Sequence, residues 1–361
     1  SYMVTPLPTS CIRSLSEDTM VTSHPRRVAS RAAGDALRPH GTRLPGDALD
    51  VLAFQAQLRN DTHRARRIFS YSLLLSRREL KPQLWAIEEA VKRGDIGEVL
   101  RNYDNALRTS REARTLLYPI LAEAIAQPQI RARLGRILRS RPVWGKEFLE
   151  FIAVSPINPQ AALALFSNPQ NRGLPITDTT RAGLVTSLVR AGDHRSAWEL
   201  YRSFHPGADP RRSRDPGFAF RTNTPAPFDW ITTSQGNISA ALLDKGTAGM
   251  LDFSVPPGVG GEVVRQLQLL PPGTYRIEGR SRGIDQPDRS RPYWSLTCMN
   301  GVELGQVTVP NSASDSGAFR GTIVVPGSCP VQALSLVARA SDQMTGSSGQ
   351  FFHLSLVPMQ K

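Results

Sequence analysis

The sequence lacks the short motifs that mark common catalytic and metal sites. It contains no HExxH, no CxxC, no Walker loop and no GxSxG, each of which places reactive groups at a defined spacing. The 6 histidines are scattered along the chain without ligand spacing. These absences predict a protein without a metal or other cofactor and favour binding over catalysis. A pair of carboxylates suited to glycoside hydrolysis leaves no sequence motif, so a hydrolase stays open as an alternative.

Long apolar runs are absent as well. No stretch of 18 apolar residues occurs, so the sequence predicts no membrane-spanning helix. Residues 1–20 lack the continuous apolar core of a signal peptide. Cys11 lies in LPTSC, but the apolar helix that precedes a lipoprotein acylation site is missing, so Cys11 is expected to be an ordinary thiol. A segment upstream of Ser1 could have been removed.

The charge is unevenly distributed. Residues from Asp209 onward carry 14 Lys and Arg against 12 Asp and Glu, so most of the net charge of +13 lies before that point. A basic half suggests an acidic partner, such as nucleic acid or an anionic glycan. Only 5 of the 44 basic residues are lysine, and an arginine excess is also common in proteins of GC-rich genomes. A solvated basic surface is therefore the competing interpretation.

One phrase occurs three times: RNDTHRARRIFSYSL, RGDIGEVLRNYDNAL and AGDHRSAWELYRSF. In each copy an aspartate follows Asn or Gly, and a small residue comes four positions after the aspartate. An aromatic residue, Tyr in two copies and Phe in one, comes eight positions after the aspartate. Asp can cap the start of a helix, and Gly or Asn can end the preceding one in a left-handed conformation. Each copy is thus predicted to be a tight turn between two helices. The expected core residues are Ala65, Phe69, Val99, Tyr103, Ala197 and Tyr201.

The first two aspartates, Asp61 and Asp95, are 34 residues apart, which is the period of tetratricopeptide repeats. Together with the residues after Asp95, this spacing resembles that family over about residues 24–206. The resemblance implies stacked helical hairpins that dock a protein partner. Residues 115–166 are helical by periodicity but lack the phrase, so two degenerate helix pairs are expected there. Residues 1–23 are expected to be irregular.

Residues 207–227 are rich in proline and arginine and predict a linker. From residue 228 the period changes to two, and PPG, NG and PGS turns separate short segments. This pattern predicts an antiparallel β-sandwich of nine or ten strands over 228–361. The expected fold class is therefore multidomain α plus β, with helical repeats followed by a jelly roll.

The stretch RQLQLLPPGTYRIEGRSRG, preceded by Phe228-Asp229-Trp230, resembles the jelly-roll carbohydrate-binding modules of bacteria, as do the last strands FRGTIVVPGSCPVQALSLVARA and FFHLSLV. The resemblance implies contact with polysaccharide. These modules often carry an Asp pair for structural calcium in the last strand, where this sequence has Phe351-Phe352-His353, so no calcium site is expected. The pairing of repeats with a sandwich resembles proteins of Proteobacteria.

Sugar binding requires aromatic faces and planar polar groups. The candidates for a glycan site are Trp230, Tyr293, Trp294, Phe319, Asp288, Arg291 and Asn300. Strand alternation places Tyr293 and Trp294 on opposite faces, so one of them should point away from the core. Core packing of both tryptophans is the competing interpretation.

Cys298 and Cys329 lie 31 residues apart in the predicted sandwich. They are either buried thiols or a disulfide, and the disulfide is favoured because secreted sandwiches commonly link strands in this way. A disulfide would indicate an oxidising compartment outside the cytoplasm. In the helical half, RARLGRILRSR places Arg133, Arg136 and Arg139 on adjacent helical turns, as candidates for anion binding. No aromatic stacking pattern accompanies them, so nucleic acid is not the expected partner.

The leading interpretation is a non-enzymatic scaffold of the bacterial cell envelope, periplasmic or otherwise extracytoplasmic. Its repeats would dock a protein, and its sandwich would contact polysaccharide or a second protein. The alternatives are a cytosolic protein scaffold that binds no glycan, and a hydrolase with an unrecognised carboxylate pair.

Overall fold

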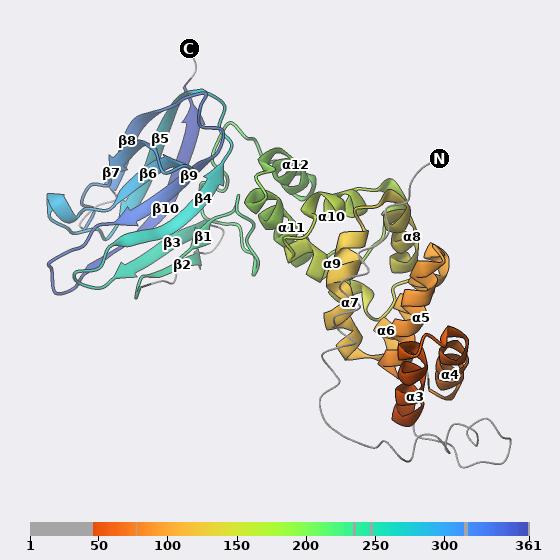
Figure 1. Ribbon diagram of the computed structural model, residues 1–361. Helices are drawn as coiled ribbons and strands as arrows, with labels where there is room; N and C mark the ends of the chain where they lie inside the picture. The colour runs from red at the N-terminus through yellow and green to blue at the C-terminus, as the bar shows by residue number, and fades with distance from the viewer. Residues whose placement is uncertain (1–45, 77, 234–235, 246–247, 314–316, 360–361) are drawn as a thin grey trace. The chain divides into compact units, whose positions relative to one another are not determined.

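The computed structural model describes residues 46–76, 78–233, 236–245, 248–313 and 317–359. Helices occupy the N-terminal part, and two antiparallel sheets of five strands each occupy the C-terminal part (Figure 1). The predicted α plus β multidomain fold is confirmed. The chain divides into two compact units, with the boundary between Ile176 and Thr177.

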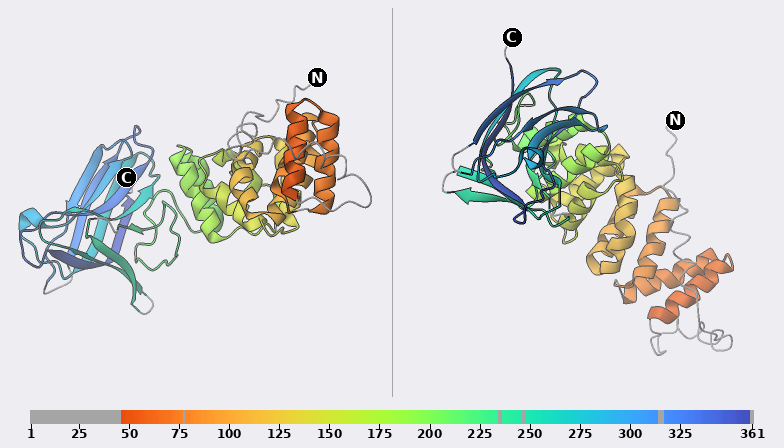
Figure 2. Two further views of the ribbon diagram at one scale, coloured as in Figure 1. Left: turned by 60° about the horizontal axis from the view of Figure 1, so that its bottom comes forward. Right: turned by 90° about the vertical axis from the view of Figure 1, so that its left-hand side faces the viewer.

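The first unit consists of helices that lie side by side (Figure 2). The helices are α3 (Gly46–Leu58), α4 (Thr62–Leu75), α5 (Leu80–Lys92), α6 (Ile96–Thr109), α7 (Arg111–Ala124), α8 (Pro128–Arg139), α9 (Gly145–Val154) and α10 (Pro159–Phe166), followed by the short 3-10 helix η1 (Pro169–Asn171). The segment expected to hold two degenerate helix pairs thus contains the four helices α7 to α10. The second unit begins with one more hairpin, α11 (Asp178–Arg190) and α12 (His194–Phe204).

The repeated phrase forms the predicted turn each time. The aspartates Asp61, Asp95 and Asp193 accept a hydrogen bond from the backbone N–H three residues ahead at 3.0, 2.9 and 3.1 Å. The residues before them, Asn60, Gly94 and Gly192, have φ angles of 58°, 69° and 79°. A left-handed residue ends one helix, and the aspartate begins the next. The helix pairs α3–α4, α5–α6 and α11–α12 pack together as hairpins.

The predicted core positions of the phrase are buried. Each of them is at most 7% exposed: Ala65, Phe69, Val99, Tyr103, Ala197 and Tyr201. Phe69 lies between Phe54 and Trp85, which joins α4 to the helix before it and the helix after it. The helical hairpins are therefore confirmed, whereas kinship with the tetratricopeptide family stays a prediction.

The described residues of the sandwich form ten strands. They are β1 (Ile231–Thr232), β2 (Ser239–Lys245), β3 (Ala248–Val255), β4 (Gly261–Gln268), β5 (Gly273–Arg282), β6 (Tyr293–Cys298), β7 (Glu303–Thr308), β8 (Gly317–Val325), β9 (Gln332–Ala338) and β10 (Ser347–Pro358), with the 3-10 helix η2 (Asp288–Ser290) before β6. Sheet A has the order β1-β4-β9-β6-β7, and sheet B has the order β2-β3-β10-β5-β8. All strand pairs are antiparallel.

The alternation of each strand sends one set of side chains into the core between the sheets. Trp294 from sheet A is fully buried and packs edge to face on Phe351 from sheet B, with ring centroids 5.5 Å apart. Burial of such aromatic side chains is a major source of the stability of a small domain. At the end of β6, Cys298 forms a disulfide with Cys329, with Cα atoms 5.7 Å apart. The disulfide alternative is thus confirmed over the buried thiols.

The boundary between the units differs from the predicted one at residue 206. The hairpin α11–α12 belongs to the second unit, together with the sandwich. Residues 207–227, predicted to be a linker, pack onto the sandwich instead: Arg214 is 9% exposed and Phe218 is fully buried. Proline and arginine suggested a solvated loop, but Phe218 joins the sandwich core beside Trp230.

Candidate functional site

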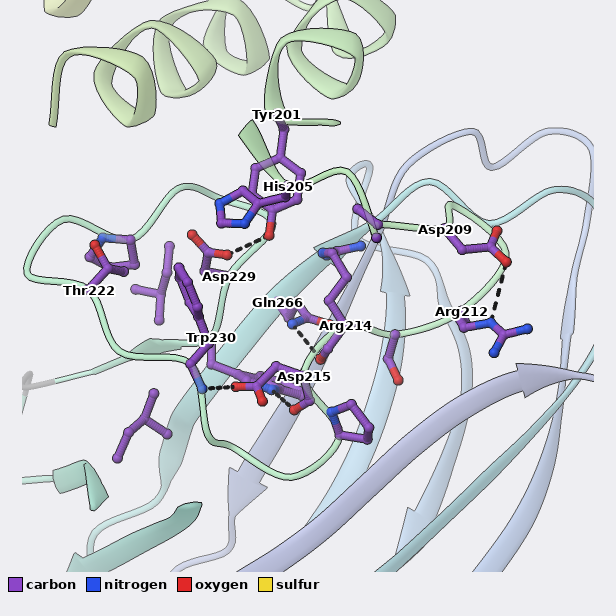
Figure 3. Close-up of a pocket in the computed structure, with 18 of the residues that line it drawn as sticks. Tyr201, His205, Asp209, Arg212, Arg214, Asp215, Thr222, Asp229, Trp230 and Gln266 are labelled. Carbon is purple, nitrogen blue, oxygen red and sulfur yellow. Dashed lines mark hydrogen bonds and ion pairs between the residues drawn. The ribbon is translucent and has the colours of Figure 1, made fainter. Parts of the chain in front are cut away.

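A cleft of about 830 Å³ lies within the second unit (Figure 3). Its walls are the end of α12, the segment from His205 to Trp230, and strands of both sheets. We call it the junction cleft. Figure 3 shows Tyr201 of α12 and His205, the residue after that helix, close to Asp229, with Arg214 and Gln266 beside them.

The wall formed by residues 213–216 is held against β10 by three hydrogen bonds. The N–H of Ser213 donates to Leu356 O at 2.9 Å, and the N–H of Leu356 donates to Ser213 Oγ at 2.9 Å. The N–H of Leu354 donates to Pro216 O at 2.8 Å. β3 pairs with β10 only up to Phe351. Beyond that residue, the backbone groups on this edge of β10 form hydrogen bonds with residues 213–216 instead of β3. Pairing of this kind satisfies buried donors and acceptors.

Arg214 lies at the base of the junction cleft and connects three parts of the unit. Its Nε donates to Phe228 O at 2.6 Å, and its Nη2 donates to Leu267 O on β4. Its guanidinium carbon lies 5.1 Å from the ring centre of Trp198 and 5.7 Å from that of Tyr201, both on α12. Burial lowers the pKa of Arg214 to about 10, so the side chain keeps its charge at neutral pH. Attraction to the aromatic faces stabilises this buried cation.

Tyr201 and Asp229 join α12 to the sandwich by a short hydrogen bond. The Tyr201 hydroxyl donates to Asp229 Oδ1 at 2.6 Å. The other oxygen, Oδ2, accepts from the N–H of Ala226 at 2.8 Å. Burial, and then the neighbouring Asp229 carboxylate, raise the pKa of Tyr201, so its hydroxyl remains protonated and donates. Tyr201 is therefore both a core residue of the repeated phrase and a wall residue of the cleft.

A tight turn at Asp215-Pro216-Gly217-Phe218 shapes the floor. Asp215 and Phe218 have φ angles of 48° and 51°, which are uncommon for residues other than glycine. The Asp215 carboxylate accepts from the N–H groups of Ala219 and Phe220 at 2.8 and 3.1 Å. The Nε1–H of Trp230 donates to Asp215 O at 3.0 Å. These bonds hold a backbone conformation that would otherwise be costly.

Aromatic side chains form the open rim of the cleft. His205 stacks on Tyr201 with ring centres 4.3 Å apart, and Phe220 meets His205 edge to face at 5.1 Å. Phe204 lies 4.7 Å from His205. Phe220 is 41% exposed. We call Phe204, His205 and Phe220 the aromatic rim.

Acidification is expected to destabilise this junction through His205. Burial holds the pKa of His205 below its usual value of 6.5; Asp229 and Asp178 raise it, and Arg214 lowers it further. The unfolded chain therefore binds the proton more readily than the folded chain, and stability is lost as the pH falls from about 6.5 toward the lower folded pKa. Thermal unfolding should show a smaller drop in Tm between pH 7.5 and pH 5.5 for His205→Phe, which keeps a ring on Tyr201 and does not titrate. Equal drops in both proteins would contradict this role.

The predicted glycan residues are not brought together. Trp230, Trp294 and Phe319 lie in the sandwich core. Of the predicted set, only Trp230 lines the junction cleft. The predicted alternation along β6 is present, because Trp294 is fully buried while Tyr293 is partly exposed on the other face. The core packing of both tryptophans explains why they form no aromatic platform.

The remaining predicted residues lie elsewhere on the sandwich. The Arg339 guanidinium lies 4.4 Å from the Tyr293 ring centre, and Arg291 forms an ion pair with Asp288 at 2.6 Å. Asn300 accepts from the N–H of Val302 at 3.2 Å in the turn after β6. These side chains form contacts on the sandwich surface and in a turn, and they do not line a common pocket.

The candidate anion site on α8 is a surface feature of the first unit. Arg133, Arg136 and Arg139 are exposed, and Arg139 donates to Gln170 O at 2.8 Å. Arg133 lies near the Asp95 carboxylate and contributes to the lowering of its pKa, which comes first from the Glu98 N–H bond. Anion binding by these residues stays a prediction.

The residues of the cleft were not singled out in the sequence, apart from Trp230 and Tyr201. Arg214, Asp215 and Phe220 lay in the predicted linker. The DPG turn and the two phenylalanines after it were a usable signal, because apolar residues next to a turn tend to pack.

In the described parts of the chain, no three His, Cys, Asp or Glu side chains gather as metal ligands. No helix among the described residues is long and apolar enough to span a membrane.

No family model matches the sequence, and no curated protein matches it. Among solved structures, similarity is found to an enzymatically active domain of tailspike protein 4 from bacteriophage CBA120, with 9% identity and a TM-score of 0.31. That match covers 42% of this chain, which spans 22% of the tailspike chain. A structure described as CBM4 matches with 18% identity and a TM-score of 0.31, covering 41% of this chain and 99% of that one. The xylan-binding domain CBM22-1 of Xyn10C from Paenibacillus barcinonensis matches with 11% identity and a TM-score of 0.27, covering 40% and 92%.

Proposed function

We propose that the chain is a non-enzymatic binding protein whose second unit holds polysaccharide in the junction cleft. The observation that carries the proposal is the combination of an aromatic rim and planar polar side chains in one hollow. The C–H face of a sugar packs on aromatic rings, and its hydroxyls need donors and acceptors in fixed directions. A pocket with a few convergent polar groups is the usual form of a small-ligand site.

Particular residues supply each part of this chemistry. Phe220 on the rim is 41% exposed, and its ring stands nearly perpendicular to that of His205. Thr222 and Arg212 are exposed polar residues that line the same hollow. Phe218, buried behind the turn, holds the rim segment in place. A sugar ring on Phe220 would thus have hydroxyl partners within the same cleft.

The carboxylates in the cleft support binding rather than hydrolysis. Glycosidases need one carboxyl group with a raised pKa as acid and a second one free to act as base or nucleophile. Both oxygens of Asp229 and both of Asp215 accept hydrogen bonds from the protein. Asp209 is bonded to the Arg211 side chain, which lowers its pKa. We therefore propose structural roles for all three aspartates.

The disulfide supports a place outside the cytoplasm. Cys298 and Cys329 are bonded, and such bonds form and persist in oxidising compartments. With a polysaccharide ligand, the cell envelope is the compartment we propose. A cytosolic scaffold would require the two cysteines to remain reduced.

For the first unit we propose the docking of a protein partner, supported by apolar side chains exposed on the hairpin α3–α4. Leu74 and Leu75, adjacent at the end of α4, are 82% and 38% exposed. Isolated exposed leucines are common, but two adjacent ones at a helix end favour a covered surface. A photo-crosslinker placed at Leu74 in cells should capture one specific protein, whereas one at the exposed Arg67 on α4 should not. Identical capture patterns at the two positions would argue against docking there.

Affinity electrophoresis of the full chain through a panel of neutral and acidic polysaccharides tests the cleft. At least one polysaccharide should retard the chain. Phe220→Ala removes the exposed ring and should weaken binding roughly threefold to tenfold, as expected for one aromatic contact. Met299→Ala is the matched control, because Met299 is a 56% exposed apolar residue in the turn after β6 and does not line the cleft.

Two outcomes would overturn the proposal. The first is the absence of retardation by every polysaccharide in the panel. The second is equal retardation of the Phe220→Ala variant and the unchanged chain, which would place any glycan site elsewhere on the molecule.

A further inference from the structure

The outer face of sheet B carries a row of arginines. On β5 the residues Tyr275, Ile277 and Ser281 point into the core and are at most 3% exposed. Alternation therefore sends Arg276, Glu278, Arg280 and Arg282 to the outer face. The register of β8 places Arg320 opposite Glu278 on the same face. We call Arg276, Arg280, Arg282 and Arg320 the arginine row.

The charges of this face are not balanced. Glu278 forms ion pairs with both Arg276 and Arg320, at 3.2 and 3.5 Å. Arg280 and Arg282 are exposed, and no ion pair is found for either among the described residues. Asp252 on β3 accepts from Gln350 at 2.9 Å. Four arginines thus face two carboxylates on this surface, with His353 opposite Arg280 in the register of β10 and β5.

The arginine row continues from the junction cleft. Ser355 and Val357 on β10 line the cleft. In the register of β10 and β5 they lie opposite Glu278 and Arg276, at the end of the row. Alternate residues of a strand are about 6.7 Å apart, so Arg276 to Arg282 spans roughly 20 Å. A chain held in the cleft could extend along β5 over Arg280 and Arg282.

The chemistry of the row favours carboxylate or sulfate groups. A guanidinium group binds such planar or tetrahedral anions with two parallel hydrogen bonds. Besides Arg320, the outward residues of β8 are Ala318, Thr322 and Val324, so β8 offers no ring for the stacking of nucleic acid bases, and the neighbouring β10 offers the ring of His353 opposite Arg280. The disulfide in the same domain also favours a compartment where nucleic acid is not the usual partner.

We infer that the polysaccharide is acidic and that Arg280 and Arg282 bind the charged groups of its sugars along the outer face of sheet B. This inference rests on the proposed function of the cleft, because it names the class of polymer that the cleft and the row would hold together. It also predicts salt-dependent binding, since exposed ionic contacts are screened by salt.

The experiment compares the full chain on polygalacturonate, on alginate and on fully methyl-esterified polygalacturonate, which has the same backbone without charge. The unchanged chain should bind at least one of the two charged polymers, and should lose binding upon esterification or at high salt. Arg280→Glu with Arg282→Glu should weaken binding roughly tenfold or more, as expected from the loss of charge-assisted hydrogen bonds. The control carries the same change of charge on other exposed surfaces, Arg265→Glu with Arg289→Glu, whose side chains are 53% and 77% exposed.

The outcomes separate this inference from the proposed function. Two results would overturn the inference that the polysaccharide is acidic, while the cleft proposal stands. They are binding to neutral polymers alone, and equal binding by the doubly reversed variant and the control. Tighter binding to single-stranded DNA than to either charged polymer, lost in the doubly reversed variant, would also overturn it and identify the row as a nucleic acid surface. If no polysaccharide, charged or neutral, is bound, both the inference and the proposed function fail.

Discussion

The fragment 228–361, cut where the sequence predicts the sandwich to begin, is expected not to fold stably. It lacks Phe218, a fully buried core residue whose ring centre lies 5.3 Å from that of Trp230. Loss of such a side chain alone costs about 3–5 kcal/mol, against a total stability of about 5–15 kcal/mol for a typical domain. The fragment also lacks residues 213–216, so Leu354 and Leu356 lose their backbone partners. Urea unfolding followed by circular dichroism should show a broad or absent transition.

The fragment 177–361 is the matched comparison. It retains the α11–α12 hairpin, Arg214 and Phe218, and it should unfold in one cooperative transition. A cooperative transition of fragment 228–361 at the same urea concentration would contradict the account of residues 207–227 as part of the domain. The shorter fragment also lacks Tyr201, Phe220 and most of the cleft wall, so it is not suited to polysaccharide screening.

The variant Arg214→Ala is expected to lower the free energy of unfolding of the second unit by about 3–5 kcal/mol, in the range of broken buried polar networks. Loss of the Arg214 side chain leaves the carbonyl groups of Phe228 and Leu267 without their donor. Each unsatisfied buried group costs about 1–3 kcal/mol. The same change removes the cation that lies over the rings of Trp198 and Tyr201. Urea unfolding monitored by tryptophan fluorescence measures the change.

The matched control is Arg211→Ala, three residues earlier in the same segment. Arg211 is exposed and pairs with Asp209 at the surface, so its removal should leave the unfolding midpoint unchanged within error. Arg214→Lys should lie between the two, because an ammonium group cannot bond two carbonyls and stack on rings at once. A change for Arg214→Ala as small as that for Arg211→Ala would show that Arg214 does not hold the junction together.

The parts of the fold that depend on local chemistry could be predicted from the sequence. The turn at Asp95 needs only a left-handed Gly94 and a capping carboxylate, so its neighbours along the chain specify it. Strands follow from period-two alternation in the same way. The disulfide remained one of two alternatives, because spacing alone did not show whether two strand ends meet.

The cleft could not be predicted in this way, because its contacts join residues far apart in the sequence. Arg214 and Gln266 bond each other through backbone and side chain at 3.1 Å across 52 positions. Tyr201 and Asp229 meet across the predicted domain boundary. Alternation showed that Tyr293 and Trp294 point in opposite directions, but only the packing of the two sheets determines which of them is buried.

The disulfide has a consequence for the integrity of the molecule after damage. The segment between Cys298 and Cys329 contains β7 and β8, and each of them is one of the two edge strands of its sheet. Outer strands are where foreign chains add and where a sheet begins to come apart. A protease that cuts between the two cysteines would leave both ends covalently attached, so the nicked chain would stay one molecule until a reductant reached it.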